Sequence, residues 1–293
     1  NFIHYSKFAF KISAIFIITG ILLFFTRGIQ TSIDFTGGTI INFNIKENSY
    51  NPEFDLRSYL KENLNQSVSL VEMASKDELH HLVITTQFLQ DESLVNTILK
   101  TIYGDAFVIE KIESIGPKIG KELKSDSLKA IFVAMLLIGI YITFRFDSYY
   151  AFGSIIALFH DVAITLSFLL FFQYEISVTI VAALLTILGY SLNDTIVIYD
   201  RIRENMKLNI DKLDRKIIAN NSLNSTLNRT IITSLTTLMV ALVLFILGGP
   251  VLQPFAMALI IGVLTGTYSS LFIATPIMLM LEEKYKLEDF KEE

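Results

Sequence analysis

The chain has 293 residues, of which 52% are hydrophobic and only 18% are charged, and its mean hydropathy is +0.51. This composition is typical of a polytopic membrane protein, because a soluble domain of this length needs far less apolar surface to build its core. The formal net charge is −5, and the absence of cysteine excludes disulfides and thiolate metal sites.

Six apolar runs each approach or exceed the ~20 residues that cross a hydrocarbon core. They predict membrane-spanning helices over residues 8–25, 128–144, 151–172, 176–199, 230–247 and 251–281. The first run ends in FFTRGIQTSID, which has no small-x-small cleavage site. We therefore expect it to remain in the protein as an anchor and not to be removed as a signal peptide.

Lysine and arginine residues predict the orientation of these spans. Lys7 precedes the first span and Lys11 lies near its start, Arg145 follows the second, and seven basic residues lie between residues 201 and 229. Because cytoplasmic loops carry an excess of positive charge, both termini and the 201–229 loop are expected in the cytoplasm. The predicted organisation is an N-terminal segment with the first span (1–28), an external domain (29–126), and a five-helix bundle with that loop and a cytoplasmic tail (127–293).

The external segment reads as a small α+β domain. Residues 38–45, 67–73, 79–88 and 106–115 have strand patterns, and residues 52–64 and 92–103 have helical spacing, with Asp91 as the N-cap of the second helix. The order β-α-β-β-α-β is that of a ferredoxin-like unit. Nothing in it has the pattern of a catalytic site, so we do not expect an enzyme.

Asp194 is the most unusual residue of the fourth span, because it lies inside the apolar run 176–199. A carboxylate near the centre of a membrane helix costs at least ~2.5 kcal/mol, and such residues commonly belong to ion or proton paths. Arg229 stands at the start of the next run, where an antiparallel helix would bring it into the same half of the membrane. The alternative is that the helix ends early and Asp194 only caps it.

Further polar residues follow the same helices. Helical spacing predicts one stripe on the fourth span and a matching stripe on the fifth, made of Thr186, Tyr190, Asn193, Asp194 and Arg201, and of Thr226, Arg229, Thr233, Thr236 and Thr237. In the third span, His160 and Asp161 fit either a proton relay or a hydrogen-bonded contact between helices. Gly262, Gly266 and Ser270 form a small-residue ridge typical of close helix packing.

Several motifs resemble one family over nearly the whole chain. They are IDFTGG at 33–38, which contains Asp34, Gly37 and Gly38, IGPKIG at 115–120, Arg145-Phe146, His160-Asp161, GYSLNDTIVIYDRIREN at 189–205, LNRTIITSLTT at 227–237 and GGP at 248–250. In this order they resemble the SecF family, the membrane subunits of the bacterial SecDF protein-translocation complex within the resistance-nodulation-division superfamily. Relatives often have a smaller residue at the position of Tyr199.

The resemblance implies a multi-pass protein of the bacterial inner membrane that pairs with SecD, associates with the SecYEG channel and a YajC-like subunit, and acts on translocating preproteins. It implies that proton flow drives export, that Asp194 carries the proton, that Arg229 modulates its charge, and that a SecD carboxylate completes the path.

The residues themselves agree with an ion gradient as the energy source, because no phosphate-binding loop is present. We expect no cofactor, no metal and no nucleic acid partner. Half of a proton-driven small-molecule exporter and a passive scaffold of the channel remain as alternatives.

Overall fold

The computed structural model describes residues 1–46, 59, 62, 68–72, 79–89, 93–208 and 213–292. The chain divides into two compact units. One is helical and comprises Asn1–Gln30 and Ser127–Glu293, and the other is the α+β unit Thr31–Asp126.

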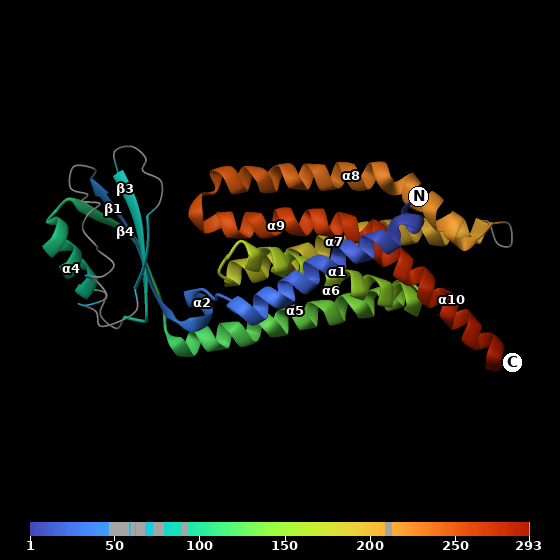
Figure 1. Ribbon diagram of the computed structural model, residues 1–293, viewed down its shortest axis with the longest axis horizontal. Helices are drawn as coiled ribbons and strands as arrows, with labels where there is room; N and C mark the ends of the chain where they lie inside the picture. Colours follow the sequence, from blue (N-terminus) through green and yellow to red (C-terminus); the bar gives the residue numbers. More distant parts are fainter. Residues whose placement is uncertain are drawn as a thin grey trace. The chain divides into compact units, whose positions relative to one another are not determined.

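The helical unit consists of long helices that run side by side (Figure 1). Their bounds are Phe2–Arg27 (α1), Pro117–Arg145 (α5), Ser148–Phe171 (α6), Val178–Leu208 (α7), Arg215–Leu247 (α8), Gly249–Ser269 (α9) and Thr275–Glu292 (α10), with a π-helical turn η2 at Ser270–Ala274 between the last two. In the described residues, six stretches are long and apolar enough to cross a membrane, and they confirm the six predicted spans.

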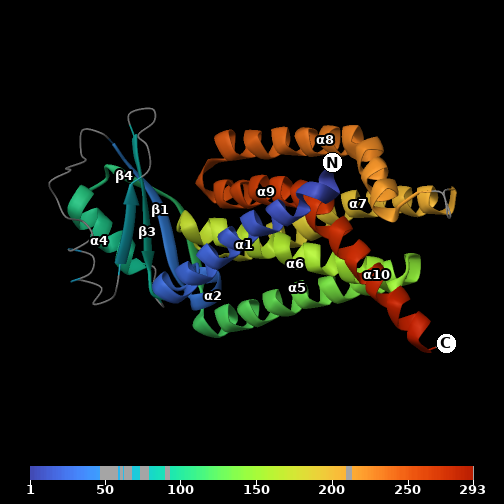
Figure 2. The ribbon, with the colours of Figure 1, turned by 45° about the vertical axis from the view of Figure 1, so that its right-hand side comes forward.

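The helices differ in how much of their surface is buried within the chain. Helices α6, α7 and α9 form the centre, and α8 packs along α9 in both views (Figure 1 and Figure 2). Helices α1, α5 and α8 leave large apolar side chains uncovered, with Phe8, Phe144 and Leu247 exposed by 65%, 89% and 78%. Apolar surface of this extent belongs against lipid or against another membrane helix.

Glycines allow the central helices to approach closely. A Cβ atom added at Gly262 would lie 2.1 Å from Cδ1 of Ile187, and one at Gly266 would lie 2.9 Å from Cβ of Ser191. Both contacts join α9 to α7, which confirms that the predicted small-residue ridge serves helix packing. Gly20 has the same role between α1 and α6, where its Cβ would collide with Ser167.

The helices α7 and α8 extend well beyond the apolar runs that predicted them. Helix α7 continues to Leu208 and α8 begins at Arg215, with the side chain of Asp214 accepting a hydrogen bond from the backbone N–H of Lys216. The prediction of a loop over residues 201–229 is therefore wrong. Charged side chains do not end a helix, and contacts such as the 2.7 Å ion pair of Arg201 with Glu204 support it outside the apolar run.

The π-helical turn ends two residues before a proline. Pro276 has no backbone N–H, and a proline ring clashes with the carbonyl four residues earlier in a regular helix. The wider turn at Ser270–Ala274 accommodates it, and the buried Tyr199 hydroxyl donates a 3.0 Å hydrogen bond to the carbonyl of Ala274. The turn is thus fixed to α7 by a side chain.

The described part of the α+β unit contains an antiparallel sheet. Its elements are α2 (Ile33–Thr36), β1 (Gly38–Lys46), β2 (Val68–Glu72), β3 (Leu79–Thr86), α4 (Ser93–Tyr103) and β4 (Phe107–Ile115), and the strand order is β2-β3-β1-β4. This is the order of a split β-α-β-β-α-β unit and confirms the predicted fold class. The helix predicted over residues 52–64, for the most part, and the N-cap Asp91 lie outside the described residues.

Alternating side chains of β1 form the core of this sheet. Ile41, Phe43 and Ile45 are at most 1% exposed and pack with Leu82, Ile84 and Leu99. One face of the strand therefore faces α4, as the period of two requires.

The glycines of the IDFTGG motif form a tight turn against the IGPKIG motif. The backbone N–H of Asp34 donates to Oγ of Ser32, which begins α2. Gly37 has a φ of 74°, and a Cβ there would lie 2.7 Å from Cα of Pro117. A Cβ at Gly38 would lie 2.7 Å from the carbonyl oxygen of Thr86. Both motifs are thus explained by close backbone packing inside this unit.

Candidate functional site

Asp194 lies in the middle of a continuous helix. Helix α7 runs from Val178 to Leu208, and the Asp194 side chain is only 4% exposed. The alternative that Asp194 caps a helix end is therefore wrong. A carboxylate at this depth in a membrane-spanning helix is expensive unless neighbouring groups interact with it.

The groups that act on this carboxylate come from the start of the apolar half of α8. The side chains of Arg229 and Thr230 lie near the Asp194 carboxyl group, so the two residues that the sequence predicted are brought together. Among the described residues, however, Oδ2 of Asp194 and Oγ1 of Thr230 have no partner in hydrogen-bond geometry. One oxygen of the carboxylate thus keeps its capacity to accept a proton, beside an exposed guanidinium.

The two predicted polar stripes meet through fewer contacts than expected. Tyr190 donates a 3.0 Å hydrogen bond to Oγ of Ser234, which joins α7 to α8. Thr233 and Thr237 instead donate to carbonyl oxygens of their own helix, and Asn193 is exposed. Thr186 and Thr236 also bond within their own helices. Among the described contacts of the predicted stripe residues, side-chain bonds between the two helices are made by Tyr190 and by Arg201, whose Nε donates a 3.4 Å hydrogen bond to Oγ of Ser225.

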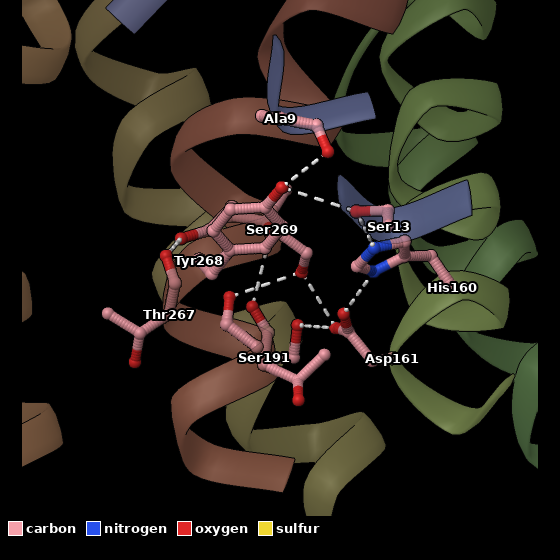
Figure 3. A network of polar contacts seen from close by, with 12 residues as sticks. Ala9, Ser13, His160, Asp161, Ser191, Thr267, Tyr268 and Ser269 are labelled. Atoms are coloured by element: carbon pink, nitrogen blue, oxygen red, sulfur yellow. Dashed lines mark hydrogen bonds and ion pairs between the residues drawn. The ribbon is translucent and has the colours of Figure 1, made fainter. Parts of the chain in front are cut away.

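His160 and Asp161 instead form the centre of a second, fully buried polar network (Figure 3). Nδ1 of His160 lies 3.0 Å from Oδ1 of Asp161, and Nε2 lies 2.8 Å from Oγ of Ser13 on α1. Oδ2 of Asp161 accepts hydrogen bonds of 2.6 Å from Ser191 on α7 and 2.8 Å from Ser269 on α9. The pair on α6 therefore joins three other helices.

Three consecutive residues at the end of α9 connect this network to the rest of the unit (Figure 3). Thr267 is hydrogen-bonded to Ser234 on α8 at 2.6 Å, and the Tyr268 hydroxyl lies 3.2 Å from Ser13 and donates to the carbonyl of Ala9 at 2.7 Å. Ser269 binds Asp161. Each residue thus contacts a different helix, directly before the π-helical turn.

Most members of this network are not evident from the sequence. The missed residues are hydroxyl side chains within apolar runs, namely Ser13, Ser191, Ser234, Thr267, Tyr268 and Ser269. Serine and threonine are common in membrane helices because they can bond to their own backbone. Their presence alone therefore gives no signal, and only the packing identifies those that bond to another helix.

Residues 94–284 match the family described as "Protein export membrane protein SecD/SecF, C-terminal". The chain is 39% identical to the protein translocase subunit SecF of Calditerrivibrio nitroreducens over 98% of its length and 95% of that protein. It is 38% identical to SecF of Escherichia coli O157:H7, over 97% of this chain and 88% of that one.

Two solved structures are similar to the whole chain. A crystal structure of SecDF from Thermus thermophilus, described as a translocon-associated membrane protein, has a TM-score of 0.83 and 35% identity over 97% of this chain. SecDF in a super-membrane-facing form has a TM-score of 0.72 and 34% identity over 100%. The chain spans 38% and 40% of the length of these two SecDF chains.

Proposed function

Because the chain belongs to the SecF family of protein translocase subunits, we propose that it pairs with a SecD subunit and uses the proton-motive force to promote preprotein export through a SecYEG-type channel. A YajC-like subunit is a further partner. In this proposal the chain spans the bacterial inner membrane with both termini in the cytoplasm, and residues 29–126 lie outside.

The observation that carries the proposal is the geometry at Asp194. Its carboxylate is buried in a membrane helix, interacts with Arg229, and leaves Oδ2 without a hydrogen bond among the described residues. A fully paired carboxylate would be held in one ionisation state, whereas this one has an oxygen to which a proton can bind. Protonation cancels its attraction for Arg229, so proton uptake changes the force between α7 and α8.

The energy that such a proton provides is sufficient to shift a conformational equilibrium. Moving one charge across 100 mV is worth about 2.3 kcal/mol. Because about 1.4 kcal/mol corresponds to a tenfold change in an equilibrium constant, one proton biases a two-state motion by more than tenfold. We propose that this motion pulls or releases the preprotein on the external side.

The test is preprotein export into vesicles with an imposed proton gradient, at equal abundance of the complex. Asp194→Asn keeps the shape of the side chain but fixes it in a neutral form, so it should assemble normally and lose all gradient-dependent stimulation. Arg229→Met should also impair stimulation. Arg229→Lys, which keeps the charge, should be milder.

Asp200→Asn is the matched control, because it changes the same chemical group on the same helix. Asp200 is 43% exposed in its side chain and forms a 3.0 Å ion pair with Arg145. This variant should export normally. Full stimulation of the Asp194→Asn protein would overturn proton coupling at this site and favour the passive scaffold.

A further inference from the structure

The hydrogen bonds around Asp161 match an ionised carboxylate. The side chain is completely buried, and its two oxygens receive donors from His160, Ser191 and Ser269. An ionised carboxylate only accepts hydrogen bonds, so all three contacts are favourable without any proton on Asp161. Nδ1 of His160 is then a donor.

The hydrogen bonds on the other side of the ring determine the state of Nε2. The Tyr268 hydroxyl donates its single proton to the carbonyl of Ala9 at 2.7 Å. The 3.2 Å contact between Tyr268 and Ser13 therefore needs the proton of Ser13. With its own proton committed there, Ser13 accepts across its 2.8 Å contact with His160, so Nε2 also carries a proton. A histidine that donates from both nitrogens is an imidazolium.

A neutral ring fits the same atoms less well. If Nε2 accepted the proton of Ser13 while Tyr268 still bonded to Ala9, two hydroxyl oxygens would face each other at 3.2 Å with no proton between them. Asp161 would also remain as an uncompensated charge within the membrane, which is costly. The ionisable groups that contact His160 are Asp161 on α6 and Tyr268 on α9, whereas α1 contributes only the Ser13 hydroxyl.

We propose that His160 and Asp161 form a second proton-binding site, in which the buried pair holds one proton as an imidazolium–carboxylate ion pair and thereby positions the helix that carries Asp194. Ser191, which donates to Asp161, precedes Asp194 by three residues on α7. Ser269, the other hydroxyl donor, directly precedes the π-helical turn. The existence of the proton is independent of the proposed function, and only its effect on export rests on that function.

The proton is measured directly by ¹⁵N NMR of histidine in the full chain, reconstituted in lipid nanodiscs at neutral pH. The sequence contains four histidines. Replacing His4, His80 and His81 by glutamine leaves His160 as the single labelled ring. We expect two ring nitrogens of the protonated type. One nitrogen of the unprotonated type would overturn the proposal.

A second measurement tests the charge through stability. His160→Gln and Asp161→Asn should each lower the midpoint of thermal unfolding, because each leaves a buried charge without its partner. The double variant His160→Gln/Asp161→Asn removes both charges and should unfold at a higher temperature than either single variant. Additive losses in the double variant would contradict an ion pair.

Export assays test whether the His160–Asp161 pair affects the function of Asp194. The NMR and unfolding measurements do not depend on their outcome. Asp161→Asn should reduce gradient-dependent stimulation by several-fold and shift its pH profile, whereas Thr143→Val, which removes an α5 hydroxyl outside the network that bonds to the carbonyl of Gly139, should leave the pH profile unchanged. If Asp194→Asn exports normally while the NMR shows an imidazolium, the proposed function fails and the second proton site stands. An unchanged pH profile in Asp161→Asn would overturn the positioning role.

Discussion

Asp161 and Asp194 are both buried carboxylates on central helices, but their hydrogen bonding is opposite. Asp161 accepts three hydrogen bonds from three helices, whereas Oδ2 of Asp194 has none from the described residues. A carboxylate that is saturated with donors is held in place, and its loss affects packing. One with an unpaired oxygen retains the capacity to change its protonation. In our proposal, Asp161 therefore positions helices, whereas Asp194 exchanges a proton.

The difference arises from the residues that surround each carboxylate. Asp161 faces the crowded centre of the unit, where Gly266 brings α9 against Ser191 and thus brings hydroxyls within bonding distance. Asp194 faces α8, which is largely exposed and whose Thr230 hydroxyl, although near the carboxylate, has no partner in hydrogen-bond geometry among the described residues. Close packing thus gives the Asp161 carboxylate its hydrogen-bond donors, whereas Oδ2 of Asp194 has none among the described residues.

The largest effect is expected where the close approach of α7 and α9 is blocked. Gly262→Ala places a Cβ 2.1 Å from Cδ1 of the fully buried Ile187 and should lower the free energy of unfolding by about 3 kcal/mol, the upper range for overpacking. Thermal unfolding of the purified chain measures this loss. Gly189→Ala on α7 is the control, since nothing lies within 4 Å of its Cβ, and it should be neutral or stabilising. Equal stability of the two variants would contradict the packing.

An intermediate effect is expected when Asp161 loses one donor. Ser191→Ala removes the 2.6 Å hydrogen bond and should cost about 1.5–3 kcal/mol, the usual range for a bond to a charged group. Thr186→Val on the same helix removes a hydroxyl that bonds only to the Ala182 carbonyl, so it should change stability by less than about 0.5 kcal/mol. Chemical unfolding of both variants checks the difference, and similar losses would mean that Asp161 does not depend on its donors.

The smallest effect on stability is expected beside Asp194. Thr230→Val removes a buried hydroxyl that has no hydrogen bond, so stability should stay within about 0.5 kcal/mol of the original or rise slightly. Gradient-stimulated export should nevertheless fall, because the variant places a methyl group where a polar hydroxyl lies beside the Asp194 carboxylate and makes the surroundings of that carboxylate less polar. Thr233→Val, whose hydroxyl bonds to its own helix, should change neither quantity. A large loss of stability with normal export in Thr230→Val would reverse the assignment of the two sites.

The sequence by itself determined the membrane spans and the ferredoxin-like class of the α+β unit, and it singled out Asp194 and Arg229. Apolar runs and alternating strands identify elements because burial has a fixed period along each of them. An ionisable residue within an apolar run stands out because its cost in lipid is large, whatever surrounds it. The sequence could not show where α7 ends, because the charged residues after the apolar run continue the helix as readily as they form a loop.

Only the tertiary structure decided which polar side chains meet. Helical spacing placed Thr233 and Thr237 on one face of α8, but both bond to their own backbone, whereas Ser13 reaches His160 from a position 147 residues away in the chain. A hydroxyl in a membrane helix bonds either to a backbone carbonyl of its own helix or to a group on a neighbouring helix, and the distance between the helices decides which. That distance is decided by glycines such as Gly266, on an element far away in the sequence. The periodicity of a single helix contains no information about it.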